Sequence, residues 1–497
     1  MNTSPDEQTP QSNPSQSSTS QTVPKRFFSR KVIRIILLFC ACLIALGVLA
    51  YIEEDVRGRI AWKHYKQERE AKGDSFELKS IVPAPVPDEE NFAALPMFKE
   101  LFQKSSTNPQ LSIIKMPIGE RLPGNWHIGK VEDLAEWRKI FKNDNLIDAL
   151  AQYSAILDEV TKASRRPHCV FPIRYEDTFN ALLPHLQPLR NLTSLYRLCA
   201  LAKLEAGQNE AAAEDVLTSL RIIQHLKNEP LLITFLVRAA MLDETIQPIW
   251  EGISAHRWNN SQLAAFQEEL KKIDQFDGFA MTLRGERILS HHTIWMSEHR
   301  SRIDFLIDFF SPMCKDCNNF SLEPYIFYLF PKGWFCQNAL TLDRFYIETI
   351  LPAVDWEHHC VSPSKIEAVH QALRVNLSPY NIFMKLLTPA MVNATAKAAM
   401  SQTSADEAVL ACALERYRLA QGDYPPTLDA LVPTFVTSLP PDRINCQPLK
   451  YRRTNDGKFV LYSVGWNEKD DGGVVATFKN RSRDYRNGDW VWAFPSK

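Results

Sequence analysis

The sequence predicts a mainly α-helical protein with a single N-terminal transmembrane helix and a small C-terminal α/β module. Three observations support this fold class. One apolar run stands near the N-terminus, periodic leucine, isoleucine and alanine fill the middle of the chain, and short segments separated by turn residues occupy its end. At 497 residues the chain is long enough for two or three domains with well-buried cores.

The apolar run extends from Ile35 to Ile52 and contains no charged residue. Its length as a helix is roughly 27 Å, close to the ~30 Å hydrocarbon core of a bilayer. Basic residues precede the run and acidic residues follow it, so the positive-inside tendency leaves the N-terminus in the cytoplasm. We therefore expect a transmembrane signal anchor over residues 32–52, embedded in a bacterial inner membrane, with the bulk of the chain in the periplasm.

Other interpretations of this run stay open. Val48-Leu49-Ala50 has the small-residue pattern that signal peptidase cuts, so a cleaved signal peptide is one alternative. The basic residues that follow the acidic cluster weaken the charge asymmetry, so the reverse topology is another. These basic residues are Arg57, Arg59, Lys63, Lys66 and Arg69. A lipoprotein attached through Cys40 is disfavoured, because the bulky Phe39 precedes it.

The segments on either side of the anchor are predicted to be non-globular. Residues 1–31 are rich in Ser, Thr, Gln, Asn and Pro, a composition that predicts a disordered cytoplasmic tail. Residues 53–90 are expected to form a solvated helical stalk and then a Pro-rich spacer, Val82–Pro87. The folded part is expected to begin near Asn91.

Residues 91–400 are predicted to form a large helical domain, because apolar residues recur there at helical spacing between prolines. The expected helices are Asp133–Lys162, Tyr175–Leu189, Leu192–Ala206, Asn209–Leu226, Leu231–Ile253, Asn260–Lys272, Thr282–Phe310, Ala339–Leu351 and Thr388–Gln421. An aromatic-rich packed loop is expected between Phe310 and Gln337.

The two segments around Gly207 form the most regular pair in this domain. They predict antiparallel helices with Gly207 as the C-cap and with small residues at the crossing. The small residues are Ala200, Ala202, Ala206, Ala211 and Ala212. The pair is similar to one tetratricopeptide-type hairpin, but the period does not recur along the chain. An irregular helical domain is therefore favoured over a repeat array.

Residues 401–497 form the predicted α/β module. A helix is expected to end at Gly422, and Thr427 is expected to N-cap a short helix. A hairpin turn is expected at Asn455-Asp456-Gly457. The expected strands are Leu449–Arg453, Lys458–Ser463, Val474–Phe478 and Trp490–Phe494.

This C-terminal segment resembles the globular part of the major pseudopilins of type II secretion systems. The matching elements are Tyr417, Gly422, Tyr424-Pro425, Leu428, Leu431, Pro440, Asp442, Tyr451, Ser463-Val464-Gly465 and Gly472-Gly473. The resemblance implies a calcium site in the loop after the last strand, where Asn467, Asp470 and Asp471 offer oxygen ligands. The alternative is a solvated acidic turn, because Asp-Gly-Gly is a common turn sequence.

Several departures separate the chain from the pseudopilins. The prepilin peptidase signal is absent, and over 300 residues lie between the anchor and the matching segment. Arg443 stands where proline is usual, and Cys446 where glycine is common. The chain more closely resembles an uncharacterised family of membrane-anchored bacterial proteins that carry such a module after a helical domain. That resemblance implies no particular activity.

The cysteines and histidines offer candidate metal sites. Eight cysteines lie outside the anchor and permit disulfides, although the sequence leaves their pairing open. Cys314 and Cys317 have redox spacing, and with His359 and Cys360 they would suit zinc. Structural disulfides or buried thiols are favoured over both uses, because no thioredoxin-like pattern surrounds the pair.

Three histidines, His291, His292 and His299, share one helical segment. His292 and His299 lie about 10 Å apart along a helix, which is too far to hold one ion, so a polar helix face is expected. Arg238 interrupts an apolar stretch and therefore needs a buried partner, for which Glu286 and Asp243 are candidates. A structural ion pair is favoured over a ligand-binding arginine.

Composition excludes some functions. The chain has 57 basic and 58 acidic residues and no basic stripe, which argues against nucleic-acid binding. It contains no GxSxG motif, no P-loop and no dinucleotide fingerprint. We therefore expect a non-catalytic, membrane-anchored envelope protein that presents a helical surface to protein partners, within a secretion or assembly apparatus. The alternative is an extracytoplasmic hydrolase whose site lies in the helical domain.

Overall fold

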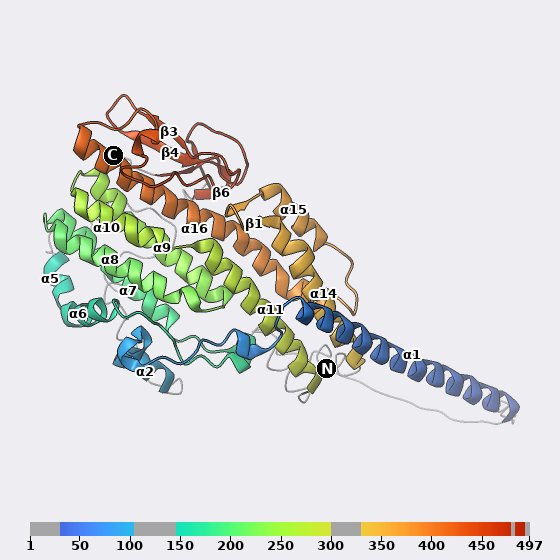
Figure 1. Ribbon diagram of the computed structural model, residues 1–497. Coiled ribbons are helices and arrows are strands. Elements are labelled where there is room, and N and C mark those ends of the chain that lie inside the picture. The colour runs from blue at the N-terminus through green and yellow to red at the C-terminus, as the bar shows by residue number, and fades with distance from the viewer. Residues whose placement is uncertain (1–29, 104–145, 300–329, 479–482, 493–497) are drawn as a thin grey trace, which may run out of the picture. The chain divides into compact units, whose positions relative to one another are not determined.

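The protein is mainly helical, with one N-terminal apolar helix and a few short C-terminal strands, as the sequence predicts (Figure 1). This architecture is seen in a computed structural model, which describes residues 30–103, 146–299, 330–478 and 483–492. The predicted tail lies outside these residues except for Arg30 and Lys31, and the pair Cys314 and Cys317 lies outside them entirely. The chain divides into two compact units, Met1–Glu54 and Asp55–Lys497. We call the second unit the body.

Helix α1 runs without a break from Arg30 to Ala71. Among the described residues it is the helix that is long and apolar enough to cross a membrane. The side chains from Val32 to Ile52 are all exposed, which is the state expected of a surface that lipid would cover. This supports a single-pass membrane anchor.

The part of α1 that belongs to the body is not a solvated stalk, contrary to the sequence prediction. Tyr65 is only 7% exposed. Gly58 packs so closely on Gly333 that an added Cβ would lie 2.2 Å from the Gly333 carbonyl oxygen. This face was not recognised because it is built from polar, aromatic and glycine residues rather than from aliphatic ones. The body therefore begins at Asp55, well before Asn91.

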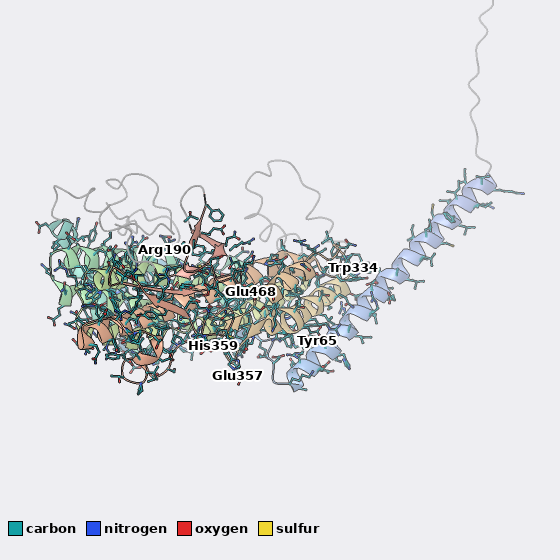
Figure 2. All side chains as sticks on the ribbon, turned by 90° about the horizontal axis from the view of Figure 1, so that it is seen from above. Tyr65, Arg190, Trp334, Glu357, His359 and Glu468 are labelled. Carbon is teal, nitrogen blue, oxygen red and sulfur yellow. A yellow bond between two sulfur atoms is a disulfide. The ribbon has the colours of Figure 1, made fainter. Side chains whose placement is uncertain are left out.

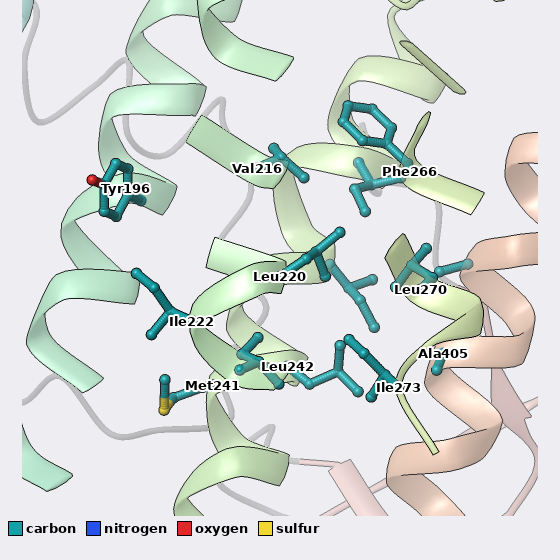
Figure 3. Close-up of a cluster of buried hydrophobic side chains, with 14 of the residues drawn as sticks. Tyr196, Val216, Leu220, Ile222, Met241, Leu242, Phe266, Leu270, Ile273 and Ala405 are labelled. Carbon is teal, nitrogen blue, oxygen red and sulfur yellow. The ribbon is translucent and has the colours of Figure 1, made fainter. Parts of the chain in front are cut away.

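Five helices contribute most of the first core of the body, part of which is drawn in Figure 3. They are α7 (Leu186–Glu205), α8 (Asn209–His225), α9 (Leu232–Ser254), α10 (Asn260–Lys271) and α16 (Ile382–Gln421). Helices α7 and α8 are the predicted antiparallel pair. Ala200 and Ala212 are fully buried at their contact. The prediction was wrong for Ala206 and Ala211, which are exposed beside the turn.

A second core joins the N-terminal half of α16 to three further helices, α11 (Gln275–His299), α14 (Lys332–Phe345) and α15 (Pro363–Ala372). Helix α16 contributes buried alanines to both cores, for example Ala398 and Ala408. The predicted domain boundary between residues 400 and 401 therefore lies inside one continuous helix.

The remaining helices are short. They are α2 (Pro96–Gln103), α5 (Leu146–Ala151), α6 (Ser154–Ala163), the 3-10 turns Leu78–Ser80, Asp88–Glu90, Phe92–Ala94, Tyr175–Asn180, Leu226–Asn228, Leu351–Ala353 and Leu428–Leu431, and the π-helical turn Tyr346–Ile350.

The predicted helix Tyr175–Leu189 is wrong in its middle. Thr178 has a φ of 50°, and Pro184 disfavours helical backbone in the residue before it. Residues 332–337, predicted as part of a loop, form the start of α14.

The C-terminal strands are short and antiparallel. One sheet has the order β3-β4-β7, a second pairs β5 with β6, and a third pairs β1 with β2. Their bounds are β1 Val354–Asp355, β2 Cys360–Val361, β3 Lys450–Arg453, β4 Phe459–Ser463, β5 Val475–Thr477, β6 Arg483–Gly488 and β7 Trp490–Val491. The predicted hairpin is confirmed, with Tyr451 opposite Leu461. Gly422 caps α16 with a φ of 88°. Strand β6 was missed because its sequence is polar.

Candidate functional site

Helix α11 buries an unusual number of polar side chains. Glu286, Arg287, Ser290 and His291 are all less than a tenth exposed, although they occupy fewer than two turns of the helix. Burying charged groups costs free energy unless they are paired. A run of buried, ionisable side chains on a core helix therefore identifies the candidate site.

The centre of the site is Asp343 on α14, whose side chain is fully buried. Its Oδ1 accepts hydrogen bonds from Arg287 Nε and from His291 Nε2, both at 2.6 Å. Its Oδ2 accepts a third from the hydroxyl of Tyr65 on α1, at 2.9 Å. One carboxylate thus links three helices, and its bond from the Arg287 guanidinium is of the strong, charge-assisted kind. We call this set of four side chains the Asp343 network.

The network continues outward through the segment that follows α1. Asp74 Oδ2 lies 3.4 Å from Arg287 Nη2 and accepts a hydrogen bond from Arg69 Nε at 2.6 Å. Charges of opposite sign therefore alternate from Arg69 through Asp74 and Arg287 to Asp343. The last turn of α1 and the chain beyond it are tied to the second core by this series.

Aromatic rings enclose the imidazole of His291. The ring of Trp62 stacks on it with centroids 5.1 Å apart, and the edge of Phe76 meets it at the same distance. The guanidinium of Arg287 lies over Phe76 at 5.1 Å from the ring centroid. Among the described residues, His291 Nδ1 has no hydrogen-bond partner. Figure 2 shows the labelled Tyr65 on α1, beside the helices of the body.

The electrostatics of the network favour its charged form. Burial by itself raises the pKa of Asp343, but the hydrogen bonds and charges of His291 and Arg287 outweigh burial and lower the pKa to about 2. Burial and the neighbouring Asp343 carboxylate raise the pKa of the Tyr65 hydroxyl. Burial lowers the pKa of Arg287, but Asp343 and Asp74 reverse that effect and raise it. Asp343 is therefore ionised and the tyrosine is neutral at neutral pH.

Glu286, on the same helix, has a different environment. Its carboxylate accepts a hydrogen bond from the backbone N–H of Leu232, at the start of α9, at 2.7 Å. Burial raises the pKa of Glu286 to about 7, and this single hydrogen bond opposes the shift only in part. Glu286 is the sequence neighbour of Arg287, and Asp343 is bonded to it. Both acids are buried, but the pKa of Glu286 is raised and the pKa of Asp343 is lowered.

The structure corrects the predicted partners of Arg238. This residue is buried, as expected, but its Nη2 donates to the backbone carbonyl of Asp274 at 3.2 Å. Glu286 caps α9 instead, and Asp243 pairs with Lys397 at 2.6 Å. A Cβ on Gly278 would lie 2.3 Å from Arg238 Nη1, so the glycine makes room for the guanidinium. Burial lowers the pKa of Arg238 to about 10.

The predicted histidine face and zinc set need correction as well. His291 is buried rather than solvated, His292 stacks on Trp295, and the side chain of His299 lies outside the described residues. Cys360 forms a disulfide with Cys446, so its thiolate is not available to zinc. The two cysteines lie 86 positions apart in the sequence, and nothing in their spacing indicates the pairing.

His359 lies instead beside two aspartates at the start of α11. Ligand atoms of His359, Asp274 and Asp277 lie within 4.8 Å of one another, which makes this group able to hold a metal ion. The group also has a purely structural use. Asp274 Oδ1 accepts the backbone N–H of Asp277 at 2.8 Å, and Asp274 Oδ2 lies 3.4 Å from His359 Nδ1. These contacts cap the helix and hold the turn between β1 and β2 against it.

In the predicted calcium loop, Asn467 and Asp471 bond to each other, whereas Asp470 has a partner outside the set of three. Asn467 donates to Asp471 Oδ2 at 2.9 Å, and Asp470 accepts from the Tyr462 hydroxyl at 2.9 Å. Asp489 also holds the loop, because its carboxylate accepts hydrogen bonds from the backbone N–H groups of Asp471 at 3.2 Å and Gly473 at 2.6 Å. Asp489 was not predicted as part of this loop.

Several of the matching elements in the C-terminal segment are in contact in the fold. Asp442 is buried and accepts hydrogen bonds from Ser463 Oγ at 2.7 Å and from the backbone N–H of Val464 at 2.9 Å. The Tyr451 hydroxyl donates to the carbonyl of Pro425 at 2.8 Å. The spacing of these elements along the sequence thus reflects direct contacts in the fold.

Comparisons with models of protein families, with curated proteins and with solved structures gave no match. The Asp343 network is therefore interpreted from its own geometry. Sequence reasoning missed Asp343, Tyr65 and Asp74. One signal could have found them: Asp55, Gly58, Trp62, Tyr65 and Arg69 recur at helical spacing and define a face that needs partners.

Proposed function

We propose that this chain is a single-pass, membrane-anchored envelope protein whose helical body presents binding surfaces to other envelope proteins and catalyses no reaction. The observation that carries this proposal is how α1 joins the body. The helix that contains the apolar run extends unbroken to Ala71, and its Tyr65 donates to the buried Asp343. The body thus includes the end of the anchor helix in its own core, an arrangement that attaches a binding domain firmly to its membrane anchor.

The body is proposed to lie in the periplasm of a bacterial inner membrane. The basic residues before the run and the acidic residues after it support this orientation. The disulfide between Cys360 and Cys446 supports it as well, because such bonds persist mainly in oxidising compartments. Alkaline phosphatase fused after Lys497, which is active only outside the cytoplasm, tests the orientation. An inactive fusion, together with alkylation of both cysteines without reductant, would overturn it.

The burial of the Asp343 network supports a structural role over a catalytic one. A catalytic acid or base must come within hydrogen-bond reach of its substrate. Asp343 is wholly enclosed, and the buried His291 ring packs against both Trp62 and Phe76. The alternative, an extracytoplasmic hydrolase, is favoured by one observation: histidine, carboxylate and arginine side chains converge at hydrogen-bond distance, as they do in many hydrolase sites.

Substitution of His291 separates the two functions. We expect His291→Asn to lower the melting temperature and to leave hydrolysis of ester, peptide and phosphate-ester substrates at background. His292→Asn is the matched control, since it removes a half-buried histidine from the same helix. A hydrolytic activity that His291→Asn abolishes without changing the melting temperature would establish the enzyme and overturn the structural role.

The C-terminal segment is proposed to be a pseudopilin-like module, which would link the protein to secretion or assembly. What supports this is the set of contacts among the matching elements, Asp442 with Ser463 and Val464, and Tyr451 with Pro425. The same resemblance keeps calcium as a proposed ligand of the loop that contains Asp470 and Asp471. Asp470 could bind the ion through Oδ2 while its Oδ1 keeps the hydrogen bond from Tyr462.

A further inference from the structure

We infer that one face of the body rests on the lipid surface of the membrane. This face, which we call the lipid-facing surface, is formed by the first turn of α14 and by the loop of residues 373–381 between α15 and α16. The inference rests on the membrane anchor of the proposed function. It adds a second, peripheral contact with the bilayer, made by residues that lie 280 positions or more after the anchor in the sequence.

The first argument is the length of chain available. Ile52 ends the apolar run, and Asp55 already belongs to the body. Three residues of chain reach at most about 10 Å even when fully extended. Asp55 Oδ1 accepts a hydrogen bond from the backbone N–H of Gly333 at 2.9 Å, at the start of α14. If Ile52 lies at the edge of the hydrocarbon, the start of α14 must lie in the headgroup region or directly beside it, whatever the angle between the two units.

The second argument is the chemistry of the residues at this position. Arg57 donates to the Tyr380 hydroxyl at 3.1 Å and also lies over its ring. Trp334 meets the edge of Tyr380, with centroids 6.1 Å apart. Tryptophan, tyrosine and arginine are the side chains that gather at the boundary between lipid and water. Figure 2 shows Trp334 at the end of the body where α1 packs.

The third argument is exposed apolar surface in the same loop. Leu377 is 69% exposed and Val375 is 47% exposed, three and five positions before Tyr380. The loop is held in place, because Asn381 donates to the Asn376 carbonyl at 2.9 Å and Asn338 on α14 donates to the Pro379 carbonyl at 2.6 Å. A fixed loop that offers leucine and valine to solvent beside an aromatic pair has the composition of an interfacial anchor.

Photo-crosslinking to lipid tests this inference on the full chain. The photoreactive residue p-benzoylphenylalanine replaces Leu377 in one variant and Leu419 in the control. Leu419 is also exposed, at 45%, but lies in the last turn of α16, roughly 55 Å along the helix from its first residue. The variants are reconstituted in phosphatidylethanolamine and phosphatidylglycerol vesicles and irradiated, and the fraction of chain carrying a phospholipid adduct is measured by mass spectrometry.

We expect at least about fivefold more phospholipid adduct at position 377 than at position 419. Equal labelling at the two positions in a chain that alkaline carbonate fails to extract from membranes would overturn the inference and leave the anchor intact. Extraction by carbonate would overturn both. Adducts at position 377 with a second copy of the chain, in place of lipid, would show that another protomer covers this surface and would also overturn the inference.

Discussion

Replacing Asp343 with asparagine is the most direct test of the Asp343 network. The substitution keeps the size of the side chain but removes the charge that Arg287 and His291 face at 2.6 Å. Among the described residues, Arg287 would then keep Asp74, 3.4 Å away, as its acidic partner. Breaking a buried ion pair by removing one member costs about 3–5 kcal/mol, since the other charge stays buried.

That cost converts into a measurable change in melting temperature. A body of roughly 440 residues has an unfolding entropy of about 0.9 kcal/mol/K, so the expected decrease is about 3–5 °C. The assay is thermal unfolding of the full chain in detergent micelles at pH 7. Asp158→Asn is the control, because Asp158 is an exposed aspartate on α6. A decrease for Asp343→Asn no larger than that of the control would refute the energetic role of the network.

The same variant has a predicted pH dependence. The pKa of Asp343 in the folded protein, about 2, is lower than its ordinary value of 3.8. Its contribution to stability is therefore fully present above pH 4 and is lost as the pH falls towards 2. The difference in stability between the parent protein and Asp343→Asn should shrink over that interval. A difference that is constant from pH 5 to pH 2.5 would contradict this assignment.

Three further predictions concern other carboxylates, of which Glu286 and Asp442 are buried and Asp470 is exposed. Burial raises the pKa of Glu286 from 4.5 to about 7, so the parent protein should lose about 3 kcal/mol of stability as the pH rises from 4.5 through 7. Glu286→Gln should abolish this loss, which urea unfolding at pH 5 and at pH 8 measures. Asp442→Asn should lower the free energy of unfolding by about 1–3 kcal/mol, because the amide group cannot accept both bonds from Ser463 and Val464. Millimolar Ca²⁺ should raise the melting temperature relative to chelator, and Asp470→Asn should remove the effect; identical melting curves with and without the ion would reject the calcium site.

The sequence predicted those parts of the fold in which one residue class repeats at one period. The anchor, α7 to α10 and α16 follow from aliphatic spacing, and the β3–β4 hairpin follows from Asn455-Asp456-Gly457 between alternating segments. The helix boundary near Thr178 was missed because a left-handed backbone at threonine has no sequence signature. Residue 401 looked like a boundary because composition changes there, while α16 continues through it.

The candidate site was less predictable because it depends on contacts between distant residues. Tyr65 and Asp343 are 278 positions apart, and each looks ordinary in its own helix. The burial of Arg238 was predicted correctly from the apolar residues around it. Its partner was wrong because a buried arginine can be held by a backbone carbonyl, here that of Asp274, and carbonyls are present at every residue.

A buried polar network is an unexpected way to attach α1 if stability is its only purpose, because well-packed apolar residues often serve equally well. Its advantage is that it specifies register. A shift of one helical turn would place Ala61 opposite Asp343 in place of Tyr65 and so remove the hydroxyl that donates to the carboxylate, whereas an aliphatic face would tolerate the shift. We therefore predict that the triple variant Asp343→Leu, Arg287→Met and His291→Leu melts within about 2 °C of the parent. It should nevertheless be cut faster by trypsin within residues 57–69, because α1 is no longer held in one position. Unchanged cleavage there would show that packing alone fixes the register of the anchor helix.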